Sequence, residues 1–290
     1  MEKISILIAN YNNGEYFKEC FTSLINQTYS NWEAIIVDDC SVDDSVNIIK
    51  KIIENDSRFL LFQNPENKGC GFTKRKCMEF ATGVICAYLD PDDALYPEAI
   101  EKAIQGYTNN NIVATYSKMM LCDENLIPHK VFSKTKNIYN NKYFFNYPIQ
   151  FAHFFTFRKC VYFKTTGINP TLKTAVDQDL YLKILELGQV KFIRKVLYKY
   201  RLHSNGISQQ DTKEVAKESF ASVIYATMKR RGIKKINKQL IPNTYKNPED
   251  IFKLLDYQLH PVYRLIMKIN LVLLQIFPKL YFKTNKSASE

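Results

Sequence analysis

Three aspartates, Asp90, Asp92 and Asp93, follow an apolar run that ends at Leu89. Carboxylates this close together raise one another's pKa unless a cation offsets their charge. Mg²⁺ or Mn²⁺ is the simplest such cation, because it binds one or two carboxylates and completes its shell with water and phosphate oxygens. The alternative is a turn in which one aspartate caps a helix that starts near Pro97.

A further carboxylate, Asp39, follows a different apolar run. In a buried position it could accept a hydrogen bond from the imide N–H of uracil or thymine, or from N1–H of guanine. Cytosine presents only an acceptor at that position and would be repelled, so Asp39 would favour some nucleotides over others. Turn capping by Asp39 and Ser41 is the alternative interpretation.

The apolar runs that precede these aspartates predict the strands of a sheet. They are short and nearly continuous, as strands covered on both faces are. They occupy residues 4–8, 34–38, 59–63, 84–90 and 112–117. Helical faces are predicted between the first three runs, at Phe17, Cys20, Phe21, Leu24 and Ile25 and again at Val46, Ile49, Ile52 and Ile53. Pro97 suits the first turn of another helix.

This alternation predicts an α/β fold with an open, doubly wound and mostly parallel sheet. Ligands of such sheets bind outside the carboxyl ends of the strands. Polar clusters follow the first, second and fourth runs, at residues 9–12, 38–43 and 90–93. We therefore expect the three clusters to converge on one edge of the sheet.

The second half of the chain has a looser pattern. Residues 117–142 are polar and rich in Asn and Lys, which predicts a long loop or a hairpin. Leu180, Ile184 and Leu187 predict a helix closed by Gly188, and residues 213–231 predict another. Residues 260–283 combine apolar residues at helical spacing with Arg and Lys, which is typical of a helix on an anionic membrane face. A core helix with a basic edge is the alternative.

Composition sets the remaining bounds. With 290 residues, 46% of them hydrophobic, the chain is expected to form one large domain with an appended segment. Its seven cysteines are scattered without a C-x-x-C spacing, which predicts neither a disulfide framework nor a zinc site and fits a reducing cytoplasm. No signal peptide or membrane-spanning run is expected. The net charge of +11 suits anionic partners, but the basic residues are spread along the chain and no nucleic-acid-binding module is recognised.

Four motifs, in order and spacing over roughly residues 4–208, resemble the inverting nucleotide-sugar glycosyltransferases of the family 2 type, which have a GT-A fold. The motifs are "ILIANYNNGEYFKECFTSLINQTYSNWEAIIVDDCSVDDS", "NKGCGFTKRKCMEFATGVICAYLDPDD", "AVDQDLYLKILELG" and "YRLHSNGIS". The resemblance implies a glycosyltransferase domain at 1–208, with a nucleotide-sugar half at about 1–117 and an acceptor half at about 118–208. A helical, basic extension would then occupy 209–290.

The resemblance also implies roles for single residues. The implied nucleotide contacts are Ala9, Tyr11, Asp39 and Lys74, and the implied metal ligands are Asp92, assisted by Asp90 and Asp93. Asp177 stands at the position of the general base, Asp179 at that of a supporting residue, and Arg201 and His203 at those of a basic motif that closes on the diphosphate or metal.

Several of these positions have alternatives or depart from the family pattern. Asp177 could instead cap the helix behind it, and His203 could be a surface histidine. Lys74 and Arg75 stand where the family commonly has "A-R-N", so which of the two points inward is open. Val176 replaces the usual glutamate before the base.

The implied function is transfer of a sugar from a nucleotide diphosphate sugar, UDP-linked, to a hydroxyl of a saccharide or lipid-linked saccharide, with inversion and with Mn²⁺ or Mg²⁺. Synthesis of capsule or lipopolysaccharide in the cytoplasm, at the inner face of the membrane, is the implied setting. A nucleotidyltransferase is one alternative, although "ANYNNG" after the first run is not the basic, glycine-rich loop it needs. An inactive relative that acts in assembly is another, and it would be expected to have lost Asp92 or Asp177.

Overall fold

The computed structural model describes residues 2–203 and 213–276. In the N-terminal half, the strands β1 (Ile4–Asn10), β2 (Trp32–Asp38), β3 (Phe59–Gln63) and β4 (Ile85–Tyr88) are all parallel, in the spatial order β3-β2-β1-β4. The first four predicted strands are therefore confirmed. Every residue of β2 is buried, because helices cover both faces of the sheet.

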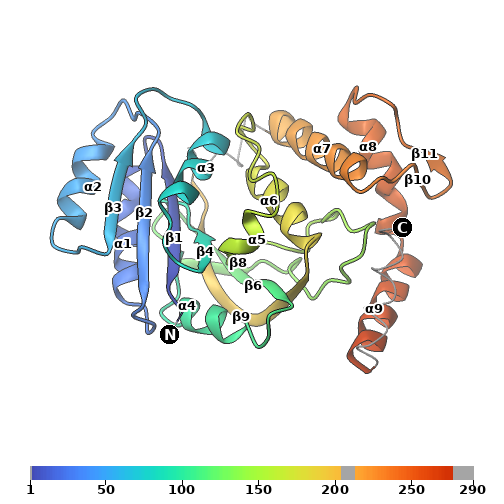
Figure 1. Cartoon of the computed structure of the whole chain (residues 1–290), viewed down its shortest axis with the longest axis horizontal. Helices are drawn as coiled ribbons and strands as arrows, with labels where there is room; N and C mark the ends of the chain where they lie inside the picture. The colour runs from blue at the N-terminus through green and yellow to red at the C-terminus, as the bar shows by residue number, and fades with distance from the viewer. Residues whose placement is uncertain (1, 204–212, 277–290) are drawn as a thin grey trace.

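Two helices cover one face of these strands and a third covers the other (Figure 1). The 3₁₀ turn η1 (Gly14–Tyr16), α1 (Phe17–Ile25) and α2 (Ser45–Ile53) follow β1 and β2. Phe17, Cys20 and Leu24 of α1 pack with Ile6 and Ile49. On the opposite face α3 (Cys70–Phe80) buries its Cys77 and Met78. The apolar face of α1 is narrower than predicted, since Ile25 is 41% exposed.

The second half extends the sheet with strands of both directions. The order continues β4-β8-β6-β9-β5, in which β8 (Phe155–Arg158) lies antiparallel between β4 and β6 (Ile112–Cys122). The long strand β9 (Gln189–Arg201) is parallel to β6 and pairs with the short β5 (Ala94–Leu95). The β6–β7 pair, with β7 at Pro128–Val131, is the predicted hairpin. A mostly parallel, doubly wound sheet is confirmed, and its antiparallel strands β5 and β8 were not predicted.

Helix ends differ from the predictions at three points. The helix α4 (Ala99–Gln105) has Glu98 as its N-cap, so Pro97 lies outside the first turn and neither Asp92 nor Asp93 caps it. The helix α6 (Val176–Leu185) ends before Gly188. A Cβ at Gly188 would lie 2.3 Å from a Val113 methyl, so this glycine allows a close approach to β6 and does not cap the helix.

The C-terminal residues form a helical layer beside the sheet (Figure 1). It comprises α7 (Lys213–Arg230), the hairpin β10 (Lys235–Ile236) and β11 (Gln239–Leu240), α8 (Pro248–Leu255), η2 (Asp256–Leu259) and α9 (Pro261–Ile276). The short helix α5 (Lys159–Tyr162) packs instead in the core of the sheet, next to β8. The predicted helix at 213–231 is confirmed. The predicted boundary at 208 lies outside the described residues, and the division into domains stays a prediction.

The core of this layer includes a residue from outside it. Ala221, Ile224 and Met228 of α7 pack with Ile251 and Leu255 of α8 and with Phe145 from the loop before β8; the listed side chains are all buried. By contrast α9 exposes its apolar side chains along one face. None of the described helices is long and apolar enough to cross a membrane.

Candidate active site

The aspartate loop after β4 contains one interior carboxylate, Asp93. It is buried, and its two oxygens accept hydrogen bonds from Tyr198 Oη (2.7 Å) and from the backbone N–H of Arg201 (2.8 Å). Burial, with Asp92 and Asp90 nearby, raises its pKa well above the usual value. Asp93 therefore fixes the loop to β9, and its role as an assisting metal ligand stays a prediction.

Asp92 lies against the basic motif at the end of β9. His203 Nε2 is 2.9 Å from Asp92 Oδ2, and Arg201 Nε donates a hydrogen bond to the Asp92 carbonyl oxygen at 2.6 Å. His203 is only 8% exposed, so it is not a surface histidine. Its ring lies 4.6 Å from that of Tyr16, between ring centroids. The structure thus brings Asp92 together with a motif that follows it by about 110 residues.

Asp90 and Asp177 share one ammonium group, that of Lys74. Lys74 Nζ lies 3.0 Å from Asp90 Oδ1 and 2.9 Å from Asp177 Oδ1, and the lysine is only 4% exposed. Arg75 points elsewhere, with Nη1 donating to the carbonyl oxygens of Thr166 and Ile168. Lys74 is therefore the inward residue of the pair, which the sequence left open.

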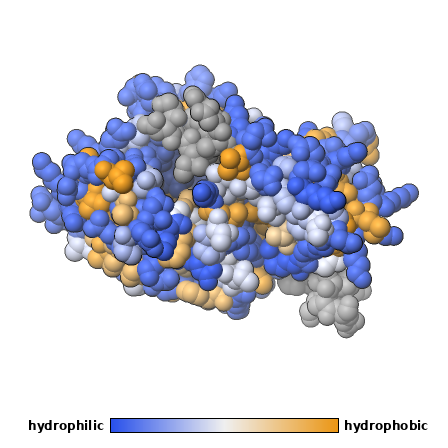
Figure 2. All heavy atoms as spheres, turned by 90° about the horizontal axis from the view of Figure 1, so that it is seen from above, coloured by the Kyte–Doolittle hydropathy of each residue, from blue (hydrophilic) through white to orange (hydrophobic). Residues whose placement is uncertain are grey.

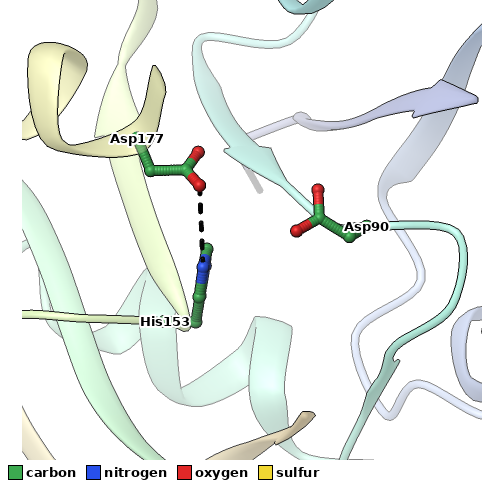
Figure 3. Close-up of side chains that lie close together, drawn as sticks. All are labelled: Asp90, His153 and Asp177. Atoms are coloured by element: carbon green, nitrogen blue, oxygen red, sulfur yellow. Dashed lines mark ion pairs between the residues drawn. The ribbon is translucent and has the colours of Figure 1, made fainter. Parts of the chain in front are cut away.

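Asp177 is the second residue of α6, and Ala175 is the N-cap, so Asp177 does not cap the helix. Burial disfavours its charged form, but the charge of Lys74 and then that of His153 outweigh burial and lower the pKa of Asp177. Nε2 of His153 lies 3.8 Å from Asp177 Oδ2 (Figure 3). A carboxylate kept ionised is able to accept a proton from a neighbouring hydroxyl.

The neighbouring Asp179 is buried and holds the segment before α6. Its Oδ2 accepts hydrogen bonds from the Asn169 backbone N–H (2.8 Å) and from Lys183 Nζ (2.7 Å). Lys183 also donates to the Gly167 carbonyl oxygen. These contacts are those that a supporting residue would make.

Asp39, a predicted nucleotide contact, orders the loop between β3 and α3. Its Oδ1 accepts from Asn64 Nδ2 and the Lys68 N–H, and its Oδ2 accepts from the Gly69 N–H at 2.7 Å. The capping partner of Ser41 is Asp38, not Asp39. Since a carboxylate oxygen has two lone pairs, Oδ2 retains one for a further donor.

The other predicted nucleotide contacts lie at the end of β1, the strand that pairs with β2. Ala9 is half-buried at the carboxyl end of β1, and Tyr11, directly after that strand, is 42% exposed. Both lie at the carboxyl edge that also carries Asp39.

Three ligand atoms, from Asp90, His153 and Asp177, lie within 4.8 Å of one another and could hold a metal ion (Figure 3). Lys74 already bridges the two carboxylates of this group, so a divalent cation would lie close to a like charge. Asp92 and His203 form the other carboxylate–imidazole pair at this edge. Carboxylate oxygens are the ligands that Mn²⁺ and Mg²⁺ prefer.

Sequence reasoning missed His153 and Tyr198. His153 lies in the apolar run "FAHFF" and Tyr198 within a strand, and neither belongs to a recognisable motif. A lone polar side chain inside an apolar run was the available signal for His153.

Comparison with known proteins places this geometry in context. The family model described as "Glycosyl transferase family 2" matches residues 5–164. The match includes the aspartate loop, whereas Asp177, Arg201 and His203 lie beyond it.

Two curated relatives come from Escherichia coli. A chondroitin synthase is 30% identical over 251 residues, which cover 83% of this chain but 34% of the relative, so the chain spans about a third of that protein. The UDP-Glc:alpha-D-GlcNAc-diphosphoundecaprenol beta-1,3-glucosyltransferase WfaP is 29% identical over 223 residues, which cover 76% of this chain and 85% of WfaP.

Solved structures share the fold. TarS 1–349 from S. aureus, in complex with UDP-GlcNAc, aligns with a TM-score of 0.65 at 20% identity, over 81% of this chain and 68% of that one. The mannosyltransferase PcManGT from Pyrobaculum calidifontis, in complex with GDP-Man and Mn²⁺, aligns with a TM-score of 0.56 at 11% identity, over 98% and 84%. The fold expected from the sequence, that of the GT-A glycosyltransferases, is confirmed.

Proposed function

Because this chain belongs to glycosyl transferase family 2, we propose that it transfers a sugar from a UDP-linked donor to an acceptor hydroxyl with inversion of configuration. The observation that carries the proposal is the assembly of Asp90, Asp92, Lys74 and Asp177 at one edge of the sheet. Inversion requires a base on the face of the sugar opposite to the leaving diphosphate. Asp177 on α6 and Asp92 on the β4–β5 loop come from different elements, as such an arrangement needs.

Asp92 and His203 would hold Mn²⁺ or Mg²⁺, since Asp90 is already paired with Lys74. The Asp92 carboxylate suits such an ion, because oxygen is the ligand that both ions prefer, and the Asp92 side chain remains 19% exposed. When bound, the ion offsets the negative charge that grows on the leaving diphosphate. Arg201 and His203 close on the same side.

Asp39, with Ala9 and Tyr11, binds the nucleoside. The free lone pair of Asp39 Oδ2 accepts the uracil imide N–H. Asp177 takes the proton of the attacking hydroxyl, and general-base help of this kind contributes roughly 10²- to 10⁴-fold in rate. Lys74 orients the Asp177 carboxylate, and Asp179 holds the segment that leads to Asp177. Neither Lys74 nor Asp179 needs to take part in the reaction.

We propose a saccharide or lipid-linked saccharide as the acceptor. WfaP, by its name, acts on a GlcNAc-diphosphoundecaprenol acceptor, and the chondroitin synthase makes a polysaccharide. These relatives support a role in polysaccharide synthesis, which we propose takes place in the cytoplasm. The face seen in Figure 2 is mostly hydrophilic, as a surface that meets saccharides would be.

A screen tests the proposal. The purified protein with Mn²⁺ is offered a panel of UDP-sugars, with p-nitrophenyl N-acetylglucosaminide and a short-chain GlcNAc diphospholipid as acceptor probes, and release of UDP is measured. We expect acceptor-stimulated UDP release with at least one donor. Nucleotide monophosphate transfer, or no release with any donor, would contradict the proposal.

We also propose that α9 contacts the inner face of the membrane. Leu265, Ile266 and Ile269 are each 46–58% exposed on one side of the helix, and Arg264 and Lys268 accompany them. Burial and these two cations lower the pKa of Lys136, which places a third basic group beside the helix. An amphipathic helix with basic neighbours binds anionic lipid surfaces. The remaining predicted residues, 277–283, lie outside the described part of the chain.

Flotation with vesicles tests this contact. The protein should float with vesicles of phosphatidylglycerol and less with phosphatidylcholine alone, and Ile269→Glu should reduce recovery. Val42→Glu, at an exposed apolar residue on another loop, is the matched control. Equal flotation of the Ile269 variant and the wild type would remove the proposal.

A further inference from the structure

His153 is held firmly beside Asp177, yet the proposed reaction assigns no role to it. Its ring stacks on that of Tyr198, with 4.9 Å between centroids and 20° between planes. Its Nδ1 lies 3.4 Å from Tyr181 Oη, one helical turn after Asp177. Tyr198 thus holds one face of the imidazole ring, and Tyr181 holds its Nδ1. The remaining nitrogen, Nε2, faces the space between Asp177 and Asp90 (Figure 3).

The loop that carries His153 is tied to the helix that carries Asp177. Asn146 Oδ1 accepts hydrogen bonds from the backbone N–H groups of Gln150 and Phe151. The Asn146 amide donates to Gln178 Oε1 at 2.7 Å, and Gln178 directly follows Asp177. Asn146 is fully buried, so this link is part of the core. The separation of the imidazole and the carboxylate is therefore set by the fold.

That separation lets one oxygen atom contact both groups from the side. Nε2 and Asp177 Oδ2 are 3.8 Å apart, which is too long for a direct hydrogen bond. The other carboxylate oxygen, Oδ1, is engaged by Lys74 at 2.9 Å. A hydroxyl oxygen placed to one side of the line from Nε2 to Oδ2 can lie at hydrogen-bond distance from both atoms.

A hydroxyl fits the space beside His153 Nε2 and Asp177 Oδ2 better than a metal ion, because the Lys74 ammonium is already close by. The Lys74 ammonium lies within 3.0 Å of both Asp90 and Asp177, so it offsets one of their two negative charges. A divalent ion between His153 and these carboxylates would be repelled by that ammonium, whereas a neutral hydroxyl would not.

We propose that His153 holds the attacking hydroxyl of the acceptor, with Nε2 hydrogen-bonded to the hydroxyl group and Asp177 Oδ2 receiving its proton. This assignment rests on the proposed function. In the transfer step the acceptor oxygen bonds to the anomeric carbon, and the bond from that carbon to the diphosphate breaks. The electron pair of that bond leaves with the diphosphate, and the hydroxyl proton passes to Asp177. His153 neither gains nor loses a proton, and it determines where the oxygen lies.

Two substitutions separate this role from a structural one. His153→Phe keeps an aromatic ring to stack on Tyr198 but removes Nε2, whereas His153→Gln places an amide nitrogen at a similar reach without the ring. His129→Phe, at the exposed histidine on β7, is the matched control. Thermal denaturation establishes that each variant is folded. Calorimetry gives the affinities for Mn²⁺ alone and for UDP with Mn²⁺.

Kinetics are then measured with the donor and acceptor probe that the UDP-release screen selects. We expect His153→Phe to raise the acceptor KM at least tenfold, with UDP affinity and UDP release into water within twofold of the wild type. His153→Gln should recover part of the acceptor KM, and His129→Phe should match the wild type.

Three outcomes would overturn the assignment. Wild-type acceptor kinetics in His153→Phe would show that Nε2 has no role. Loss of Mn²⁺ affinity in that variant would make His153 a metal ligand instead. Equal defects in the Phe and Gln variants would reduce His153 to a packing residue. Absence of UDP release in the wild type would count against the proposed function itself, and the assignment would fall with it.

Discussion

Gly71, in the first turn of α3, allows the donor side of the site to touch the segment that leads to Asp177. Its backbone N–H donates to the Leu172 carbonyl oxygen at 3.0 Å. A Cβ at this position would lie 2.6 Å from the carbonyl oxygens of both Asn169 and Leu172. Both are backbone atoms, so no side chain can rotate away to relieve the contact.

Gly71→Ala is therefore expected to push this segment away from α3. The distance from the added methyl to these two carbonyl oxygens is about 0.8 Å shorter than the 3.4 Å at which ordinary contact begins. The segment must therefore move by a similar amount. Asp177 follows it by five residues, and a displacement of about 1 Å at a reacting group can cost on the order of 10²-fold in rate. We expect kcat for transfer to fall roughly 10- to 100-fold, within that bound.

The assay compares the transfer rate with UDP affinity in the same preparation. Asp39, which binds the loop before Gly71, should still hold the nucleotide, so the Kd for UDP should change by less than about threefold, under 1 kcal/mol. Gly106→Ala is the control, because its Cβ would meet the Thr115 methyl at 2.7 Å, in a helix end away from the site. That variant should lose stability without losing kcat. An unchanged kcat in Gly71→Ala would refute the reasoning.

Three further predictions concern single carboxylates. Asp177→Asn should retain UDP affinity and lose at least ~10²-fold in transfer rate, and wild-type transfer would exclude Asp177 as the base. Asp92→Ala should abolish the gain in UDP affinity that Mn²⁺ gives, measured by calorimetry; the same gain in variant and wild type would remove the metal role. At the opposite edge of the sheet, burial raises the pKa of Glu33, but hydrogen bonds from Lys3, Ser5 and Thr82 outweigh it and lower the pKa to about 2 from 4.5. Its stabilising effect is full above pH 4.5 and is lost as the pH falls toward 2. Glu33→Gln should therefore reduce the free energy of unfolding by about 3 kcal/mol at pH 7 and by far less near pH 2.5, as followed by urea denaturation. A difference that does not vary with pH would contradict this.

The first half of the fold could be predicted because its signals are local. Each parallel strand is a short apolar run, and the aspartate loop directly follows one of them, so chain order alone brings Asp39 and Asp92 to one edge. The second half could not be predicted in the same way. The antiparallel β8 depends on pairing with β4 and β6, and the pairing of an apolar run is not encoded in its periodicity.

The site divides along the same line. Asp177 and His203 were found through a family resemblance, since neither stands out as a single residue. His153 and Tyr198 belong to no motif, and their positions follow from contacts between loops far apart in the sequence. Gly188 was misread as a cap because a glycine needed for close approach and a glycine needed for a left-handed turn look alike in a sequence.

Phe145 bears on how far the protein could be shortened by an engineer. Its side chain is packed in the core of α7 and α8, although it precedes His153 by only eight residues. The same loop is held from outside by Gln258, which donates to the Tyr143 carbonyl oxygen, and by Arg231, which donates to that of Phe144. Trimming the chain after the sheet would leave Phe145 in water and release the loop. Transplanting the sheet with another C-terminal region would likewise alter how the acceptor is received, even with every aspartate retained.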